Sequence, residues 1–199
     1  DRSLVGVSGG KDSLTLLHLL QERSKRVPVH YELLSVYIDL GFDLSRAEIL
    51  KNFFEAKGLP HHIEFTDIGR RANSFENREN PCFLCSWERR KRLFHLAHRF
   101  KCNKIALGHH KDDIIETLLL NIFYSAEIST MIPLQSLFKG KITLIRPLAL
   151  MEEKKIEIKV DESVALGQYS NLAAIRHSRE EIIFDFAFLF PDGPMGKLV

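Results

Sequence analysis

The stretch "LVGVSGGKDSLTLL" at residues 4–17 decides the fold of this chain. A short apolar run, typical of a strand over 3–8, ends in a turn of glycines, serines, a lysine and an aspartate. Leu14, Leu17 and Leu20 then recur at the spacing of one helix face. A turn between a strand and a helix brings backbone N–H groups together at the positive end of the helix dipole. The stretch therefore predicts a phosphate-binding turn.

The turn itself, residues 8–13, is called the phosphate loop below. The helix dipole contributes only about 0.3–1 kcal/mol to anion binding, so Lys11 and the hydroxyls of Ser8 and Ser13 must add charge and hydrogen bonds. Its spacing differs from that of a Walker loop, because only two glycines precede the lysine. The residues expected to surround the phosphate groups are Ser8, Gly9, Gly10, Lys11, Asp12 and Ser13.

Strands and helices alternate as far as about residue 150, which favours parallel βαβ units. Further strands are predicted at 33–39, 61–67, 104–110 and 141–148, with helices between them, one of them at about 86–100. We therefore expect an α/β fold with a doubly wound, five-stranded parallel sheet over residues 1–153. From about Lys155 the sequence alternates apolar and polar residues and ends in a strand-like run, 182–190. Residues 154–199 are predicted to form a β-rich appendage.

The composition bounds the class of protein. The 28 Lys and Arg residues nearly balance the 26 Asp and Glu residues among 199 in total. Three cysteines, an odd number, argue against a disulfide scaffold, and no apolar stretch reaches the length that crosses a bilayer. We expect a cytoplasmic protein without membrane contact.

A second motif, "LGHHKDDIIETLLLNIFY" at 107–124, follows the fourth predicted strand. Ligands of doubly wound sheets bind at the carboxyl ends of the strands, so this motif and the phosphate loop are expected at one edge. Gly108 permits close approach of a nucleotide, and Asp113 opens the next helix, where a carboxylate is favoured. His109 and His110 are ambiguous between packing and function.

The segment "PCFLCSWERRKRLF" at 81–94 contains Cys82 and Cys85 as a C-x-x-C pair, which by itself indicates a redox pair, a metal-ligand pair or chance. The third cysteine, Cys102, is predicted to be a core residue. Between Arg70 and Lys111 there are eleven Lys and Arg residues against three Glu. Such a cluster suits an RNA backbone, although it is also typical of a solvated helix face.

These motifs carry a resemblance. "SGGKDS" and the 107–124 motif resemble the ATP-pyrophosphatase (PP-loop) superfamily, whose members split ATP between the α and β phosphates. The C-x-x-C pair between them, with "MIPLQSLFKGKITLIRPL" at 131–148, resembles the tRNA 2-thiocytidine synthetase branch. The tail, through "VDESVALGQYSNLAAIRHSREEIIFDF" at 160–186, resembles a small strand-rich bacterial family of unknown function.

The resemblance implies an adenine nucleotide alpha hydrolase-like sheet and ATP-dependent thiolation of tRNA, with ATP and Mg²⁺ as cofactors. A pyrimidine carbonyl oxygen would be adenylated with release of pyrophosphate, and sulfur from a Cys82/Cys85 site would then displace AMP. Lys11 and Asp12 join the two cysteines as catalytic residues. The further residues expected at the nucleotide are Tyr37 and Ile38 beside the adenine, with Arg89, Gly108, His109 and Asp113.

In that branch three cysteines bind a four-iron, four-sulfur cluster, two from the C-x-x-C pair and one further downstream. This sequence has no cysteine after Cys102. The implied partners are tRNA and a sulfur donor such as a cysteine desulfurase, and pairing of two copies through strands of the tail stays open. The alternatives are a nucleotide- or RNA-binding module without catalysis, a chimeric chain, or a lysidine-type tRNA synthetase, which has no need of Cys82 and Cys85.

Overall fold

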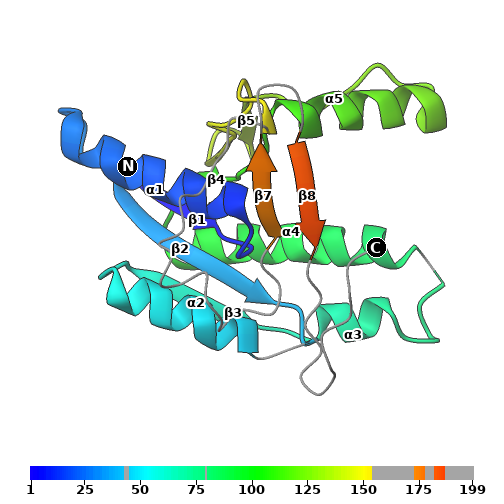
Figure 1. Cartoon of the computed structure of the whole chain (residues 1–199), viewed down its shortest axis with the longest axis horizontal. Coiled ribbons are helices and arrows are strands. Elements are labelled where there is room, and N and C mark those ends of the chain that lie inside the picture. The colour runs from blue at the N-terminus through cyan, green and yellow to red at the C-terminus, as the bar shows by residue number, and fades with distance from the viewer. Residues whose placement is uncertain (43–44, 79, 154–172, 178–181, 187–199) are drawn as a thin grey trace. The chain divides into compact units, whose positions relative to one another are not determined.

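The computed structural model describes residues 1–42, 45–78, 80–153, 173–177 and 182–186. Its helices and strands are labelled in Figure 1. The chain divides into two compact units, Asp1–Glu157 and Ile158–Val199, whereas the sequence predicted a boundary between residues 153 and 154. Each unit is described by itself.

The first unit is built on one sheet. Its strands are β1 (Arg2–Gly6), β2 (Glu32–Asp39), β3 (His61–Phe65), β4 (Lys104–Ala106), β5 (Leu134–Leu137) and β6 (Ile142–Ile145). They lie in the order β3-β2-β1-β4-β6-β5. The neighbours from β3 to β6 are parallel, as predicted, and β5 pairs antiparallel with β6. The sheet therefore has six strands, and the prediction of five missed β5, a short edge strand with two exposed residues among its four.

The helices lie between the strands in the chain. They are α1 (Lys11–Arg26), α2 (Ser45–Ala56), α3 (Ile68–Ala72), α4 (Pro81–Arg99), α5 (Lys111–Leu120) and the π-helix η1 (Asn121–Ser125). Helix α4 begins at Pro81 rather than near residue 86. The Asn80 side chain accepts hydrogen bonds from the backbone N–H groups of Cys82 and Phe83, and proline suits the first helical position. The cysteine pair therefore lies within the helix rather than before it.

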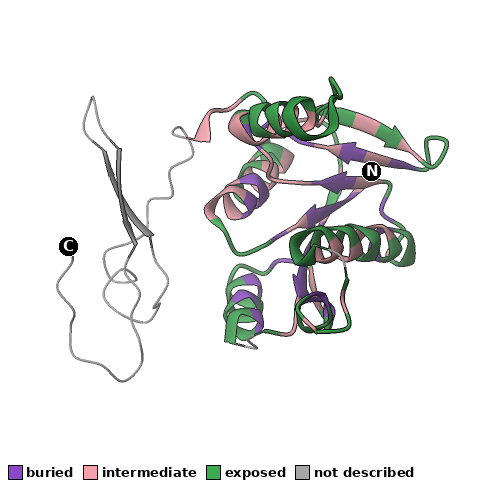
Figure 2. Cartoon of the chain, turned by 90° about the vertical axis from the view of Figure 1, so that its right-hand side faces the viewer, coloured by how far each residue is buried: buried purple, intermediate pink, exposed green. Residues whose placement is uncertain are grey.

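The sheet is buried on both faces, as Figure 2 shows for its central strands. On one face Val5 packs with Leu16 of α1 and Phe54 of α2. On the other face Leu4 packs with Ile68 of α3 and Leu96 of α4. Neighbouring strand residues point to opposite faces, so Leu4 and Val5 belong to different clusters. Helices on both faces confirm the predicted doubly wound fold.

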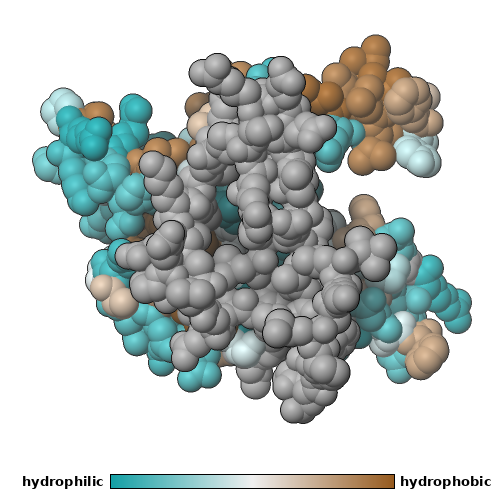
Figure 3. Space-filling model, in the orientation of Figure 1, coloured by the Kyte–Doolittle hydropathy of each residue, from teal (hydrophilic) through white to brown (hydrophobic). Residues whose placement is uncertain are grey.

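Helix α5 and η1 contribute no residue to either core. None of their residues is buried, and most of their large apolar side chains are exposed, from Ile122 at 39% to Tyr124 at 85%. Figure 3 shows a brown patch over α5 and η1 at the upper right. An exposed apolar surface of this kind marks a contact with another molecule or segment more often than a free face.

No helix within the described ranges is both long and apolar enough to cross a bilayer. In the second unit β7 (Ala173–His177) pairs antiparallel with β8 (Ile182–Phe186), in agreement with the antiparallel β-structure expected there. The alternating run near 156–160, also expected to be a strand, lies outside the described residues.

Candidate active site

The main pocket of the first unit has a volume of about 550 Å³ and lies at the carboxyl ends of β1, β2 and β4. The predicted residues that line it are Ser8, Asp12, Ser13, Tyr37, Ile38, Arg89, Gly108, His109 and Asp113. The predicted residues outside its lining are Gly9, Gly10, Lys11, Cys82 and Cys85. The parallel sheet thus brings together three segments that are far apart in the sequence, at the edge where such folds bind ligands.

The phosphate loop is held by its own hydrogen bonds. The Ser13 hydroxyl donates to the carbonyl oxygen of Gly10 at 2.9 Å and accepts from the backbone N–H of Ser8 at 3.1 Å. Gly9 has a φ of +84°, a conformation that favours glycine. Gly10 is the N-cap residue of α1 and provides no side-chain cap, which leaves the first-turn N–H groups of the helix for a ligand. The Ser13 hydroxyl, predicted to bind phosphate, is therefore already used to shape the loop.

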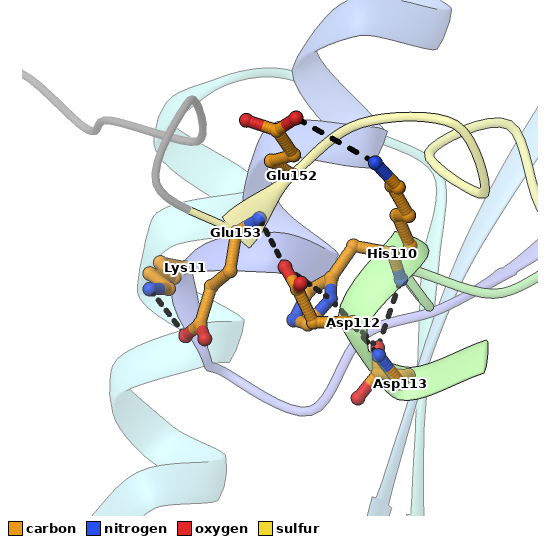
Figure 4. A network of polar contacts seen from close by, with 7 residues as sticks. Lys11, His110, Asp112, Asp113, Glu152 and Glu153 are labelled. Atoms are coloured by element: carbon orange, nitrogen blue, oxygen red, sulfur yellow. Dashed lines mark hydrogen bonds and ion pairs between the residues drawn. The ribbon is translucent and has the colours of Figure 1, made fainter. Parts of the chain in front are cut away.

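Lys11 has a partner outside the pocket. Its Nζ lies 2.7 Å from Oε1 of Glu153, and the backbone N–H of Glu153 donates to Oδ2 of Asp112 at 2.7 Å (Figure 4). Next to it, Lys111 pairs with Glu152 at 3.6 Å. A short segment after the last strand of the sheet thus binds both the phosphate loop and α5. Sequence reasoning missed Glu153, because no local pattern connects residues 142 positions apart.

Asp12 turns toward the pocket with an oxygen that lacks a partner. Its Oδ1 is buried and receives no hydrogen bond within the described part of the chain. Burial raises the pKa of this carboxyl, opposed by the nearby charges of Lys11 and His110. An unpaired buried carboxylate oxygen is a site for a cation or a donor group.

Gly108 allows the turn after β4 to touch the phosphate loop. A Cβ atom at this position would lie 3.0 Å from the carbonyl carbon of Asp12 and 3.0 Å from the backbone nitrogen of Ser13. These neighbours are backbone atoms, which cannot rotate away as a side chain could. Gly108 therefore has a packing reason as well as the predicted ligand role.

The two histidines of the second motif differ in role. His110 is buried and caps α5: its Nδ1 accepts from the backbone N–H of Asp113, and its own backbone N–H donates to Oδ2 of Asp113 at 2.8 Å. His109 instead lines the main pocket. The sequence left both open, and the structure separates a capping histidine from a pocket histidine.

The end of β2 forms the opposite wall, where Tyr37 and Ile38 are joined by Asp39. Asp39 is 1% exposed; its Oδ1 accepts from the backbone N–H of Gly41 at 2.6 Å, and its Oδ2 has no partner among the described residues. A carboxylate after the second strand of a nucleotide-binding sheet suits a ribose hydroxyl. Asp39 is not among the site residues predicted from the sequence, although its position at the end of a predicted strand is a signal that could have identified it.

One face of α4 points toward the pocket. Ser86, Arg89 and Arg90 line it. Cys82 lies four residues before Ser86 and Cys85 four residues before Arg89, which places both cysteines on the same side of the helix. Cys82 is exposed, and Cys85 is half-buried against the core. The thiols are therefore placed beside the pocket at its α4 side, although they do not line it.

Part of the basic cluster is explained by local contacts. Arg71 pairs with Asp67, and Arg92 with Glu64 at 3.5 Å. No carboxylate within the described ranges pairs with Arg89 or Arg90. Arg89 and Arg90 thus line the pocket without a carboxylate partner, at a place where an anionic ligand would meet them.

The thiols supply a partial metal site. Cys82 and Cys85 fit two of the three cysteine ligands that the resemblance implies. Cys102 is 5% exposed and lies beyond the far end of α4, where burial raises the pKa of its thiol. The described residues contain no group of three or more His, Cys, Asp or Glu placed to hold a metal ion. A cluster at this face would need a ligand other than these cysteines.

Two family models match the sequence. The model described as a PP-loop domain matches residues 1–164. A second, described as a protein of unknown function (DUF3467), matches residues 136–198. The two matches overlap, and both agree with the resemblances seen in the sequence.

Curated relatives and a solved structure are similar to most of this chain. The tRNA-cytidine(32) 2-sulfurtransferases of Geobacter sulfurreducens and Citrifermentans bemidjiense are 42% and 43% identical over 160 and 162 residues. These alignments cover 78% of this chain and 61% and 62% of the relatives, so the chain spans about three fifths of their length. The U34-tRNA thiolase NcsA from Methanococcus maripaludis, solved with its [4Fe-4S] cluster, has a TM-score of 0.62 and 26% identity, covering 78% of this chain and 53% of that one.

Proposed function

Because the chain belongs to the PP-loop domain family, we propose that it is an enzyme that thiolates tRNA with ATP, producing 2-thiocytidine. The main support is the arrangement of one pocket: the phosphate loop forms one side, and the face of α4 that carries Cys82 and Cys85 borders the other. The sulfurtransferase relatives favour this function over a lysidine-type synthetase.

The first step activates the base. The carbonyl oxygen at C2 of the cytosine attacks the α-phosphorus of ATP, the bond from that phosphorus to the bridging oxygen breaks, and pyrophosphate leaves. The N–H groups at the start of α1, together with Lys11, bind the pyrophosphate end. Asp12 and Asp113 would hold Mg²⁺, which when bound offsets the negative charge of the phosphate groups. The unpartnered Oδ1 of Asp12 fits this use.

The second step replaces the oxygen. A persulfide on one thiol of the Cys82/Cys85 pair attacks C2, the C2–O bond breaks, and AMP leaves with the oxygen. The other thiol then attacks the first cysteine's sulfur, releasing 2-thiocytidine and forming a Cys82–Cys85 disulfide. A cysteine desulfurase supplies the persulfide sulfur, and a thiol reductant restores the pair. No step requires a cluster.

The RNA substrate must present an unstacked base. The target atom of a stacked base is out of reach, so a single-stranded or flipped cytidine is needed. Arg89 and Arg90, which lack carboxylate partners among the described residues, would bind the adjoining phosphate groups.

We further propose a cytoplasmic location, a nucleotide-binding domain of residues 1–153 with a separate tail, and a homodimer. The exposed apolar side chains of α5 support the homodimer, and sedimentation velocity tests it.

The decisive experiment combines ATP labelled at the α-phosphate, bulk tRNA and a persulfide donor. We expect AMP and pyrophosphate to form only with tRNA, and mass spectrometry of the digested RNA to detect 2-thiocytidine. AMP release without a thiolated nucleoside, but with a lysine adduct when lysine is added, would indicate a lysidine-type enzyme. Absence of AMP release would leave a nucleotide- or RNA-binding module.

A further inference from the structure

A small cavity of about 30 Å³ lies behind the main pocket. Arg146 lines only this cavity, whereas His109 and Arg90 line both it and the main pocket. His109 therefore borders both spaces, and Arg146 borders only the small cavity. Neither Arg146 nor this arrangement was selected from the sequence.

Arg146 is a buried cation without an anionic partner. It is 7% exposed, and the described carboxylates include none within ion-pair distance of its guanidinium. One of its terminal nitrogens donates to the carbonyl oxygen of Ile132 at 2.5 Å, and its Nε has no partner. Burial of an unpaired guanidinium is costly, so a further role for its free N–H group is expected.

His109 also has a buried polar atom without a hydrogen-bond partner. Its Nδ1 is buried and without a hydrogen-bond partner within the described residues. Burial, then the positive charge of Arg146, lowers the pKa of His109; Arg89 and Arg90 add to this, while Asp113 opposes it. A neutral imidazole has one donor nitrogen and one acceptor nitrogen.

A guanidinium is a cation that only donates, so it favours the tautomer in which the ring nitrogen nearest to it carries the lone pair. The small cavity has room for one water molecule, and the positive charge of Arg146 would orient the water oxygen toward Nε, so that the water donates a hydrogen to Nδ1 of His109. The proton of the imidazole then resides on Nε2. The guanidinium behind the ring thus selects one of the two tautomers.

The position of His109 indicates what this proton binds. On one side Gly108 touches the phosphate loop at Asp12, and on the other Arg90 belongs to the cysteine-bearing face of α4. The proposed reaction transfers an oxygen from the base to the α-phosphate between these two sides. A fixed donor at that place stabilises charge on the oxygen as the C2–O bond breaks.

We propose that His109 donates its Nε2 hydrogen to the pyrimidine carbonyl oxygen, and that Arg146 is a positioning residue that fixes this tautomer. The inference rests on the proposed function and refines it. A hydrogen bond from a neutral donor withdraws less charge from the oxygen than one from an imidazolium would, and so leaves the oxygen more nucleophilic. Because Nε2 already carries a proton, His109 does not act as a general base.

The tautomer can be measured without activity. In the full chain labelled with ¹⁵N-histidine, long-range ¹H–¹⁵N spectra distinguish the two neutral tautomers, and the His109→Asn spectrum identifies the His109 signals. We expect the Nε2–H tautomer in the wild type and in Arg146→Lys, whose ammonium also only donates. Arg146→Met should show a mixture. If it fails to fold, Arg146→Gln makes the same test, because an amide can also accept. An Nδ1–H tautomer in the wild type, or no change in Arg146→Met or Arg146→Gln, would overturn the proposal.

Enzyme activity tests whether the Nε2 hydrogen of His109 is donated to the pyrimidine carbonyl oxygen. The side-chain nitrogen of Gln overlaps Nε2 of histidine, so His109→Gln should retain tRNA-dependent AMP release within about tenfold, whereas His109→Leu should lose on the order of a hundredfold or more. ATP affinity should change by less than about twofold in both, since the oxygen belongs to the base. Equal losses in both variants, or a matching loss of ATP affinity, would contradict the assignment. A wild type that releases no AMP would refute the proposed function instead, and the spectra would still decide the tautomer.

Discussion

The two sides of the main pocket differ in how their polar groups are partnered. In the phosphate loop and the turn before α5, Ser13, His110 and Asp113 are used in internal hydrogen bonds that hold the backbone. On α4, Arg89 and Arg90 have no carboxylate partner among the described residues, and Cys82 is exposed. The first side is formed before any ligand arrives, whereas the second presents unpaired charges and thiols to a partner. Changes on the two sides should therefore affect different steps.

Replacing the thiols should give the largest effect. Cys82→Ser and Cys85→Ser are each expected to lower 2-thiocytidine formation on the order of a thousandfold or more, because serine cannot carry a persulfide. ATP affinity and the release of pyrophosphate in the first step should persist, since these belong to the other side of the pocket, whereas AMP should no longer be released because it leaves only when sulfur attacks C2. Nucleoside mass spectrometry and calorimetry measure the two quantities on the same samples.

Cys102→Ser is the matched control, because this thiol is buried far from the pocket. Thiolation that survives in Cys82→Ser and Cys85→Ser would remove the sulfur role from α4. Anaerobic iron and sulfide reconstitution of the same variants shows whether the two thiols also bind a cluster.

Lys11→Ala should weaken ATP binding by about ten- to a hundredfold, the range of a charge-assisted hydrogen bond. The fold should persist, because the Lys11 ion pair is partly exposed. Lys25→Ala, at the other end of α1 and paired with Glu22, is the control. Equal ATP affinity in the two variants would remove Lys11 from the phosphate site.

The double variant Arg89→Gln/Arg90→Gln should weaken tRNA binding by about tenfold. The slope of the logarithm of the binding constant against the logarithm of the salt concentration should become less steep by the amount expected for the loss of about one to two phosphate contacts. ATP affinity should change little. Filter binding over a range of salt concentrations gives the slope, with Arg26→Gln at the end of α1 as control. An unchanged slope would place the RNA on another surface.

The smallest expected effect has the opposite sign. Glu153→Gln should increase ATP affinity by about two- to fivefold, because the Glu153 carboxylate competes with phosphate for Lys11 and a partly exposed ion pair contributes only about 1 kcal/mol or less. Its backbone hydrogen bond to Asp112 is preserved in the variant. A decrease in affinity would indicate that Glu153 supports the nucleotide rather than competing with it.

The sequence predicted most of the nucleotide side because its signals are local. The strand, turn and helix around residues 8–13 are contiguous, and the parallel sheet was deducible from alternation alone. The predicted start of α4 was about five residues too late, because the Asn80 cap and Pro81 that begin the helix lie in a polar stretch without helical periodicity. Strand β5 was missed because four residues at a sheet edge carry little pattern.

What the sequence by itself determined was the doubly wound sheet, the two motifs at its carboxyl edge and the cysteine pair, since periodicity and spacing along the chain encode these. Only the tertiary structure decided the partners. It brought Glu153 to Lys11 and Arg146 behind His109, and it assigned the Ser13 hydroxyl to the loop and His110 to a helix cap. Such contacts join residues distant in sequence, or use polar atoms whose partners are set by packing, and no local pattern specifies either.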